Sequence, residues 1–197
     1  TAYAESKIDT EKEVSQMADS QFSPVFLRNA TAYGHSPMLR IDLVVNNLLG
    51  CAFSRGKISI KSDGSPWRPL IHCKDIARAF IALAEAPTDK VHNQIINIGA
   101  NRENYQVKDV ADKVKKLIPS SVIEYTGEVG NDPRNYKVKF DHLYNLLPDF
   151  KLAYTLETGM EELLQKYREH QFSAQDFDGD QFVRLRTLTN RLEKIQN

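Results

Sequence analysis

The chain has 197 residues, 41% of them apolar, and its 26 Lys and Arg residues are balanced by 26 Asp and Glu. This length suits one large domain or two small ones. A formal net charge of zero excludes the broad electrostatic attraction that binding to nucleic acid or to an anionic membrane surface requires. Because apolar runs stay far below the roughly 20 residues that cross a bilayer, we also expect no membrane segment.

Neither the cysteines nor the acidic residues form a recognisable metal site. Cys51 and Cys73 show no metal-ligand spacing and no disulfide framework, so we expect free thiols in a reducing, cytoplasmic setting. The acidic run at 176–180 resembles a calcium loop, but Gln181 replaces its required Gly and Thr187 its bidentate Glu. We therefore expect a helix-capping turn there and no bound metal.

The chain starts at Thr1, without an initiating Met or a signal peptide, and we expect it to be the C-terminal portion of a longer protein. Residues 3–18 are helix formers without Gly or Pro, which predicts a helix. A short buried strand is predicted at 25–27, followed by a loop at 29–37 that is rich in Gly, Asn, Ser and Pro. Ligands of open α/β sheets bind at the carboxyl ends of strands, so this loop is a candidate binding segment.

The rest of the chain continues to alternate between helix and strand patterns. This alternation predicts an α/β fold. Amphipathic or apolar helix patterns occur at 41–53, 75–84, 107–118, 143–147, 156–170 and 182–195. Strand patterns occur at 57–61, 70–71, 94–98, 122–125 and 136–140.

Tyr3 and Lys7 are the first pair that could carry chemistry. Four residues apart, they share one face of the first predicted helix. An ammonium beside a phenol favours the phenolate, which lets a tyrosine act as a base near neutral pH. The spacing alone is common in proteins, so an ordinary exposed helix pair is the alternative interpretation.

Four further segments follow this pair in order. They are 26–34 (FLRNATAYG), 62–77 (SDGSPWRPLIHCKDIA), 96–99 (INIG) and 132–136 (DPRNY). In this order and at these separations, the series resembles the extended short-chain dehydrogenase/reductase family, the NAD-dependent nucleotide-sugar epimerases and dehydratases. The resemblance covers almost the whole chain and thins after about residue 171.

The resemblance implies the C-terminal part of a Rossmann-type parallel sheet plus a smaller mixed α/β substrate-binding domain. Residues 1–30 would belong to the NAD(P)-binding domain and 31–197 mainly to the substrate domain, with about 68–100 returning to the Rossmann sheet. The chain contains no glycine-rich dinucleotide-binding turn, so we expect it to bind NAD poorly by itself.

The resemblance also implies roles for individual residues. Tyr3 would be the acid/base that takes a proton from a sugar hydroxyl while hydride leaves for NAD or NADP, and Lys7 would hold the nicotinamide ribose. Ala32 would contact the cofactor. His72 is expected to be a hydrogen-bonded core residue, whereas His35 would line the substrate cleft.

Five residues are implied contacts of the nucleotide-diphosphate sugar. Arg68 and Arg134 lie where the family binds the diphosphate, a role that suits the guanidinium fork. Thr31 stands where the family often has Asn. The threonine keeps a hydrogen-bond donor at this position, but its side chain is shorter. Arg40 and Asn46 are further candidates. A surface ion pair for the arginines and a satisfied helix asparagine at position 46 remain the alternatives.

These roles favour an NAD(P)-dependent nucleotide-sugar epimerase that transiently oxidises a sugar hydroxyl. A 4,6-dehydratase or a reductase of the same family remains open, because their distinguishing residues precede the tyrosine. A catalytically silent sugar-nucleotide binding module is the alternative from another class. The resemblance further implies a homodimer.

Overall fold

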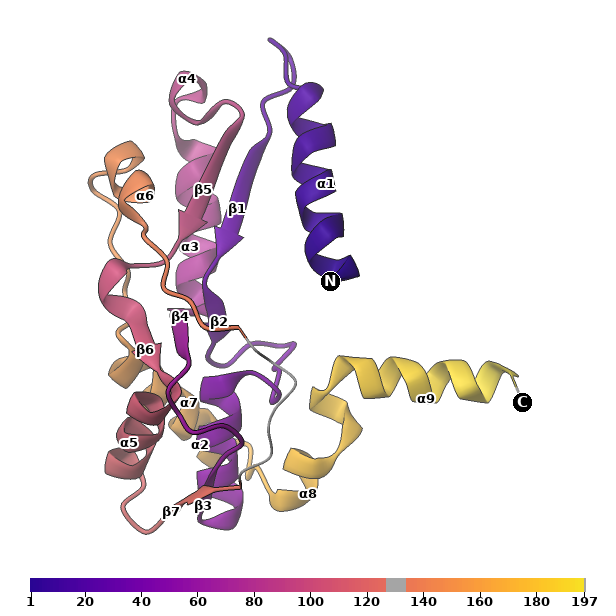
Figure 1. Cartoon of the computed structure of the whole chain (residues 1–197), viewed down its shortest axis with the longest axis vertical. Helices are drawn as coiled ribbons and strands as arrows, with labels where there is room; N and C mark the ends of the chain where they lie inside the picture. Colours follow the sequence, from indigo (N-terminus) through magenta and orange to yellow (C-terminus); the bar gives the residue numbers. More distant parts are fainter. Residues whose placement is uncertain (127–133, 197) are drawn as a thin grey trace.

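The structure is a computed structural model that describes residues 1–126 and 134–196. It confirms the α/β prediction, because strands pair in parallel and alternate with helices along the chain. The described strands form a β1–β5 sheet, a β2–β4–β6 sheet and a β3–β7 sheet. Figure 1 shows the β1–β5 sheet at one end of the molecule and the other two toward the opposite end.

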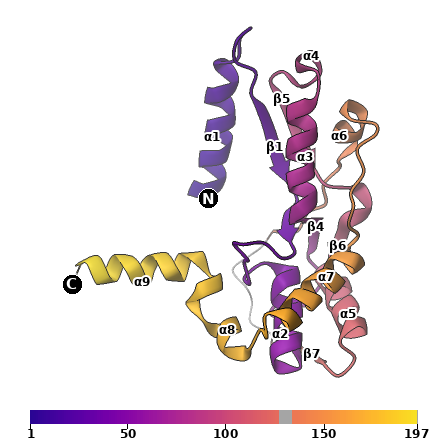
Figure 2. The ribbon, with the colours of Figure 1, turned by 180° about the vertical axis from the view of Figure 1, so that it is seen from behind.

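One end of the molecule is built around β1 (Val25–Asn29) and β5 (Gln94–Ile98), which run parallel with Leu27 opposite Ile96. Helix α1 (Ala2–Gln16) lies beside β1 (Figure 1), and α3 (Cys73–Glu85) lies alongside the same pair, as Figure 2 shows from behind. The core of this end is formed by buried aliphatic and aromatic side chains from α3, β5 and the segments that neighbour them: Ala30, Ile71, Ala79, Leu83, Val91, Ile96, Ile98, Phe140 and Leu143.

The sheets of the other end connect segments that lie far apart in the sequence. β2 (Thr31–Tyr33) runs parallel to β4 (Trp67–His72), which pairs on its other side with the antiparallel strand β6 (Asn104–Gln106). β3 (Lys57–Ile60) runs parallel to β7 (Val122–Tyr125).

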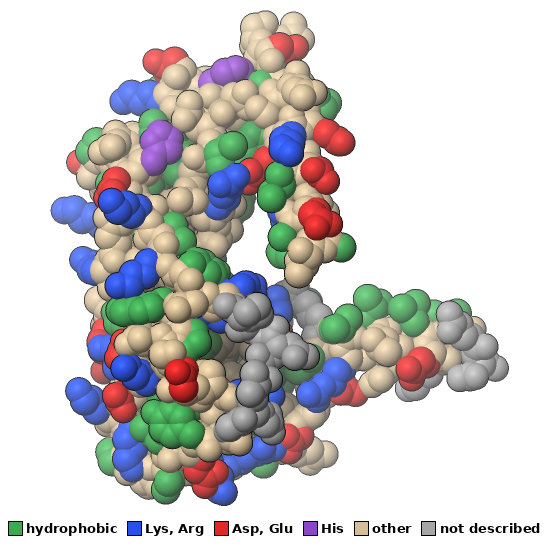
Figure 3. All heavy atoms as spheres, in the orientation of Figure 1, with side chains coloured by type: hydrophobic (Ala, Val, Ile, Leu, Met, Phe, Trp, Pro, Cys, Tyr) green, Lys and Arg blue, Asp and Glu red, His purple; other side chains and the backbone are tan. Residues whose placement is uncertain are grey.

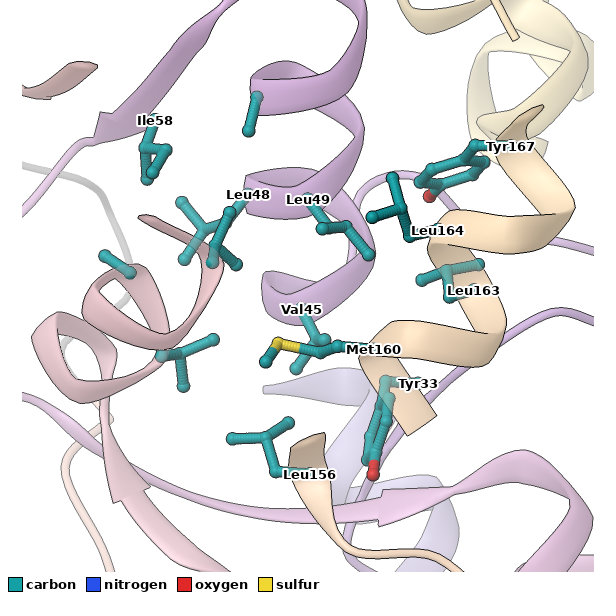
Figure 4. Packing of buried hydrophobic residues seen from close by; sticks show 14 of the residues in the cluster. Tyr33, Val45, Leu48, Leu49, Ile58, Leu156, Met160, Leu163, Leu164 and Tyr167 are labelled. Atoms are coloured by element: carbon teal, nitrogen blue, oxygen red, sulfur yellow. The ribbon is translucent and has the colours of Figure 1, made fainter. Parts of the chain in front are cut away.

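A second core lies between three helices of this end: α2 (Val44–Arg55), α5 (Val107–Leu117) and α7 (Leu156–Glu169). Figure 4 shows side chains of α2 and α7 pointing toward one another across this core. They follow helical spacing on both helices, so each presents one apolar face. The labelled members on α2 and α7 are Val45, Leu48, Leu49, Leu156, Met160, Leu163, Leu164 and Tyr167.

Short elements complete the described chain. They are α4 (Thr88–Val91), η1 (Asn101–Glu103), α6 (Asp141–Leu146), α8 (Ala174–Asp178), η2 (Asp180–Phe182) and α9 (Arg184–Gln196). Helix α9 extends away from the body of the molecule in both ribbon views (Figures 1 and 2). Among the described residues, no helix combines the length and the apolar character that crossing a membrane requires.

Three local predictions were wrong. The predicted strand at 136–140 is irregular, because the backbone N–H groups of Val138 and Phe140 donate to the side chains of Asn104 and Asn101 instead of to a neighbouring strand. The predicted loop at 29–37 contains strand β2, whose partner β4 lies far along the chain. The predicted acidic turn is mostly helix α8, capped by the Ser173 side chain.

Candidate functional site

The segment that follows β2 surrounds a cavity of about 140 Å³. The cavity lies where β2 ends and α2 and α3 begin, the position at which open α/β sheets bind ligands. Of the predicted site residues, Ala32, Arg40 and Asn46 line it. Sequence reasoning did not single out the other lining residues, which are Tyr33, Gly34, Ser36, Met38, Leu43 and Cys73.

Gly34 opens this segment in a conformation that few other residues could adopt. Its φ is +102°, and a Cβ added there would lie 2.3 Å from Nε2 of His72. The positive φ disfavours L-residues, and the contact leaves no room for a methyl group. The backbone at the mouth of the cavity is therefore packed directly on the His72 ring.

Arg40 is the cationic residue among those that line the cavity. Its guanidinium donates two hydrogen bonds to the carboxylate of Asp42, from Nε over 3.1 Å and from Nη2 over 2.5 Å. The pKa of Arg40 is raised, first by these hydrogen bonds and, as a smaller contribution, by the phenol of Tyr3. Tyr3 and Arg40 therefore lie within electrostatic range of each other, although Tyr3 belongs to α1 and Arg40 to the segment before α2.

Tyr3 and Lys7 lie on the first two turns of α1. The Lys7 Nζ is 5.5 Å from the centroid of the Tyr3 ring, and the Tyr3 side chain is 74% exposed. Residues 1–10 are exposed along their whole length. The space-filling view shows open space between this end of α1 and helix α9 (Figure 3). The pair therefore lies on an exposed part of the surface.

Arg68 and Arg134 come together at the start of β4. One Nη of Arg68 donates to the carbonyl of Trp67 over 2.8 Å and also to the carbonyl of Arg134. The Asn135 side chain accepts from the backbone N–H of Trp67 over 3.0 Å, and Lys137 Nζ lies 3.5 Å from the Trp67 ring centroid. These contacts bring the two predicted diphosphate arginines to one place in the fold. Neither lines the 140 Å³ cavity, and Asp132 and Pro133 of the predicted motif lie outside the described residues.

His72 lies behind the cavity and is buried, as predicted for a core residue. Its Nδ1 accepts from the backbone N–H of Lys74 over 3.3 Å, so its Nε2 carries the proton and donates to Glu162 over 3.0 Å. Its ring stacks on Tyr154 with centroids 3.9 Å apart. Burial lowers the pKa of His72, although Glu162 opposes that shift. The predicted core role of His72 is confirmed.

The remaining predicted residues occupy different positions. Thr31 begins β2, opposite Leu70 of β4. His35 stacks on His170 at the end of α7, with centroids 5.4 Å apart, and it does not line the cavity. Cys51 and Cys73 are free thiols, and the Sγ of Cys73 donates to the carbonyl of His35 over 3.2 Å. Within residues 1–126 and 134–196, no cluster of His, Cys, Asp and Glu could hold a metal ion.

Comparison with known proteins gives matches over most of the chain. Residues 1–99 match the NAD dependent epimerase/dehydratase family. The chain is 30% identical, over 183 residues, to the Trifunctional UDP-glucose 4,6-dehydratase/UDP-4-keto-6-deoxy-D-glucose 3,5-epimerase/UDP-4-keto-L-rhamnose-reductase RHM3 of Arabidopsis thaliana. That alignment covers 90% of this chain but only 26% of the plant protein.

Solved structures share the fold. The epimerase Mth375 from Methanothermobacter thermautotrophicus has a TM-score of 0.70 at 19% identity, over 84% of this chain and 48% of that one. The UDP-glucuronic acid 4-epimerase of Bacillus cereus, solved with UDP-glucuronic acid and NAD, has a TM-score of 0.65 at 22% identity, over 76% and 46%. The chain thus spans about half of these solved proteins and about a quarter of RHM3.

Proposed function

Because this chain belongs to the NAD dependent epimerase/dehydratase family, we propose that it supplies the acid/base pair and the sugar-nucleotide pocket of a nucleotide-sugar epimerase. One observation carries the proposal. Tyr3 and Lys7 project from the open end of α1, and the Tyr3 phenol lies within electrostatic range of Arg40, which lines the cavity after β2. A proton acceptor and a polar pocket thus lie near each other.

In this proposal, the Tyr3 phenolate accepts the proton of a sugar hydroxyl, and the nearby Lys7 ammonium stabilises the phenolate. NAD or NADP, when bound, supplies the hydride acceptor for the same sugar carbon. After the keto sugar has turned over in the pocket, Tyr3 would return the proton to the carbonyl oxygen, and the hydride held by the bound cofactor would add to the opposite face of the same carbon, which restores the hydroxyl with inverted configuration. Arg40 forms part of the wall along which the sugar lies.

The residues of this chain fit part of a dinucleotide site. Tyr3 and Lys7 are exposed on one helix face, so both can reach a nicotinamide ribose, and Ala32 lines the adjacent cavity. The sequence lacks a glycine-rich turn for the pyrophosphate. We therefore propose that residues 1–30 and about 68–100 contribute to a dinucleotide-binding domain, and that most of 31–197 forms the substrate domain.

Arg68 and Arg134 are proposed to bind the diphosphate of the substrate. The contact between the Arg68 guanidinium and the Arg134 carbonyl fixes the two residues relative to each other. If the Arg134 side chain also turns toward this place, the two guanidinium groups together suit a ligand with several anionic oxygens. The UDP-sugars named for the plant and bacterial relatives have this chemistry.

The test is to incubate the protein made from its complete reading frame with NAD and a panel of UDP- and dTDP-sugars, and to follow the products by mass and chromatography. A product of unchanged mass and altered retention supports an epimerase. Loss of water would indicate a 4,6-dehydratase, and gain of two hydrogens with NADH or NADPH a reductase. Binding of sugar nucleotide without turnover would instead favour a silent binding module. Light scattering on the same sample tests the proposed homodimer.

A further inference from the structure

Asn46 is a buried polar side chain whose amide does not point to open space. It lies in the first turn of α2 and is 2% exposed. Its Oδ1 accepts from the backbone N–H of Gly34 over 2.9 Å, and its Nδ2 donates to the carbonyl of Arg40 over 2.9 Å. One side chain therefore joins the two ends of the segment 34–40, which we call the pocket loop.

The pocket loop contributes Gly34, Ser36, Met38 and Arg40 to the lining of the 140 Å³ cavity. Its shape therefore sets the shape of one cavity wall. Its own backbone forms neither helix nor strand beyond bends and turns, so side-chain hydrogen bonds have a large share in holding it. Asn46 provides two of them, one at each end.

The position of Asn46 is itself fixed by a neighbouring helix. The phenol of Tyr167 on α7 donates to the backbone carbonyl of Asn46 over 3.1 Å, inside the packed core between α2 and α7. The two side-chain hydrogen bonds of Asn46, which we call the clamp, thus connect the core between α2 and α7 with the pocket loop. A side chain held on a rigid helix positions its partners more exactingly than one held on a loop.

An amide suits this position for a chemical reason. The loop presents one donor, the Gly34 N–H, and one acceptor, the Arg40 carbonyl, so the clamp must offer an acceptor and a donor side by side. A carboxylate offers acceptors only and would face the Arg40 carbonyl without a proton between them. A buried acceptor left opposite another acceptor is costly.

We propose that Asn46 is a positioning residue: it sets the affinity for the sugar nucleotide by clamping the pocket loop at both ends, not by touching the ligand. The ligand part of this proposal rests on the proposed function. The effect on the loop does not, because it concerns only groups of this chain. The two parts can therefore fail separately.

The test compares Asn46→Asp with the matched control Asn47→Asp. Asn47 is the next residue of α2, and its Nδ2 donates over 3.1 Å to the carbonyl of Ile41, just beyond the pocket loop. The control thus introduces the same charge and loses a hydrogen bond to the same segment between β2 and α2. It leaves the Gly34–Asn46–Arg40 clamp intact. Both variants are studied in the full chain, with urea unfolding to compare their global stabilities.

Two readouts are needed, hydrogen exchange and binding of UDP-glucose by calorimetry. We expect Asn46→Asp to speed backbone exchange in peptides covering 34–40 by about 10- to 100-fold, and to weaken UDP-glucose binding by about tenfold or more. Asn47→Asp should change both by less than about threefold. If Asn46→Asp is too unstable to study, Asn46→Ser, which is too short to reach both loop ends, is used in its place.

Several outcomes would overturn the proposal. Unchanged exchange with lost binding would mean that Asn46 contacts the ligand directly. Faster exchange with unchanged affinity would mean that the loop does not shape the ligand site, and equal effects of both variants would mean a merely structural role. If the unmodified chain binds no sugar nucleotide, the proposed function fails, whereas the exchange result still decides whether Asn46 clamps the loop.

Discussion

The N-terminal end of α1 and the pocket loop carry the two halves of the candidate site, and the chain holds them very differently. Residues 1–10 of α1 are exposed throughout, and α1 contributes no buried residue. The pocket loop is instead packed on His72 through Gly34 and clamped by the buried Asn46. The difference indicates that the Tyr3 side chain can be changed without disturbing the fold, whereas changes in the pocket loop should also affect folding.

The largest expected effect is on turnover, in Tyr3→Phe. Removing the phenol oxygen removes the proposed acid/base, and such groups typically contribute about 100- to 10,000-fold to the rate. Because the Tyr3 side chain is 74% exposed, the variant should unfold at the same urea concentration as the unmodified protein. Tyr125→Phe, at a side chain that is 57% exposed, is the control and should keep full activity. Equal turnover in both variants would remove Tyr3 from the mechanism.

The next effect is on stability, in Gly34→Ala. The new Cβ would lie 2.3 Å from His72 Nε2, at a φ of +102°, so we expect a loss of roughly 2 to 5 kcal/mol in the free energy of unfolding. Gly56→Ala is the matched control, since its φ is +68° but nothing lies within 4 Å of its added Cβ. It should cost only about 1 to 2 kcal/mol. Urea unfolding measures both, and equal losses would show that the packing on His72 does not matter.

A third effect concerns pH, through the buried His72. Burial lowers its pKa below the ordinary value of 6.5, so the unfolded chain binds a proton that the folded protein does not. The folded protein therefore keeps its full stability with respect to His72 above pH 6.5. Below that value, the free energy of unfolding decreases by up to about 1.4 kcal/mol per pH unit for one proton. The same direction of shift at His35, again chiefly from burial, adds to the effect.

The variant His72→Gln separates the two histidines. It should flatten the pH dependence of the unfolding free energy in the range below about pH 6.5, leaving the part that belongs to His35. The control His35→Gln should remove only the part of the pH dependence that belongs to His35. The prediction is contradicted if the free energy of unfolding of the unmodified protein rises as the pH falls below 6.5. Such a rise would mean that the folded state binds the extra proton.

Sequence reasoning predicted the α/β fold, and the family resemblance is confirmed by the match over residues 1–99. Helix and strand periodicity was sufficient where one face is apolar, as in α5 and α7. It failed at 136–140, because Asn101 and Asn104 bind that backbone from far away in the sequence. No local pattern reports such a contact.

The site shows the same limit. The family resemblance indicated Asn46, and the position of Arg40 after the Ser36–Pro37 turn made it a further candidate; both line the cavity after β2. The role of Asn46 could not be predicted, because it depends on where Gly34 and the Arg40 carbonyl lie in space. Met38 and Ser36 were also missed. The sequence shows only that both residues belong to a Gly- and Pro-containing loop at the end of a strand. That feature does not distinguish one loop residue from the next.

The smallest effect tests what holds α1 beside β1. The carboxylate of Glu11 accepts from Nε of Arg28 over 2.9 Å and from its Nη2 over 2.5 Å, and the pKa of Glu11 is lowered, first by this hydrogen bonding. Arg28 is 53% exposed, so Glu11→Gln should cost only about 0.2 to 1 kcal/mol, and less at high salt. Urea unfolding at low and high salt measures the cost, with the exposed Glu13→Gln as control.

The two outcomes of this last change have different meanings for the candidate site. If the cost stays below 1 kcal/mol while turnover also falls, the Arg28–Glu11 pair orients α1, and with it Tyr3 and Lys7, without stabilising the fold. A loss of several kcal/mol would contradict the comparison, because the exposed helix would then be as firmly integrated as the pocket loop. The exposure of α1 along residues 1–10 favours the first outcome, since a helix end with few contacts has little stability to lose but can still change direction.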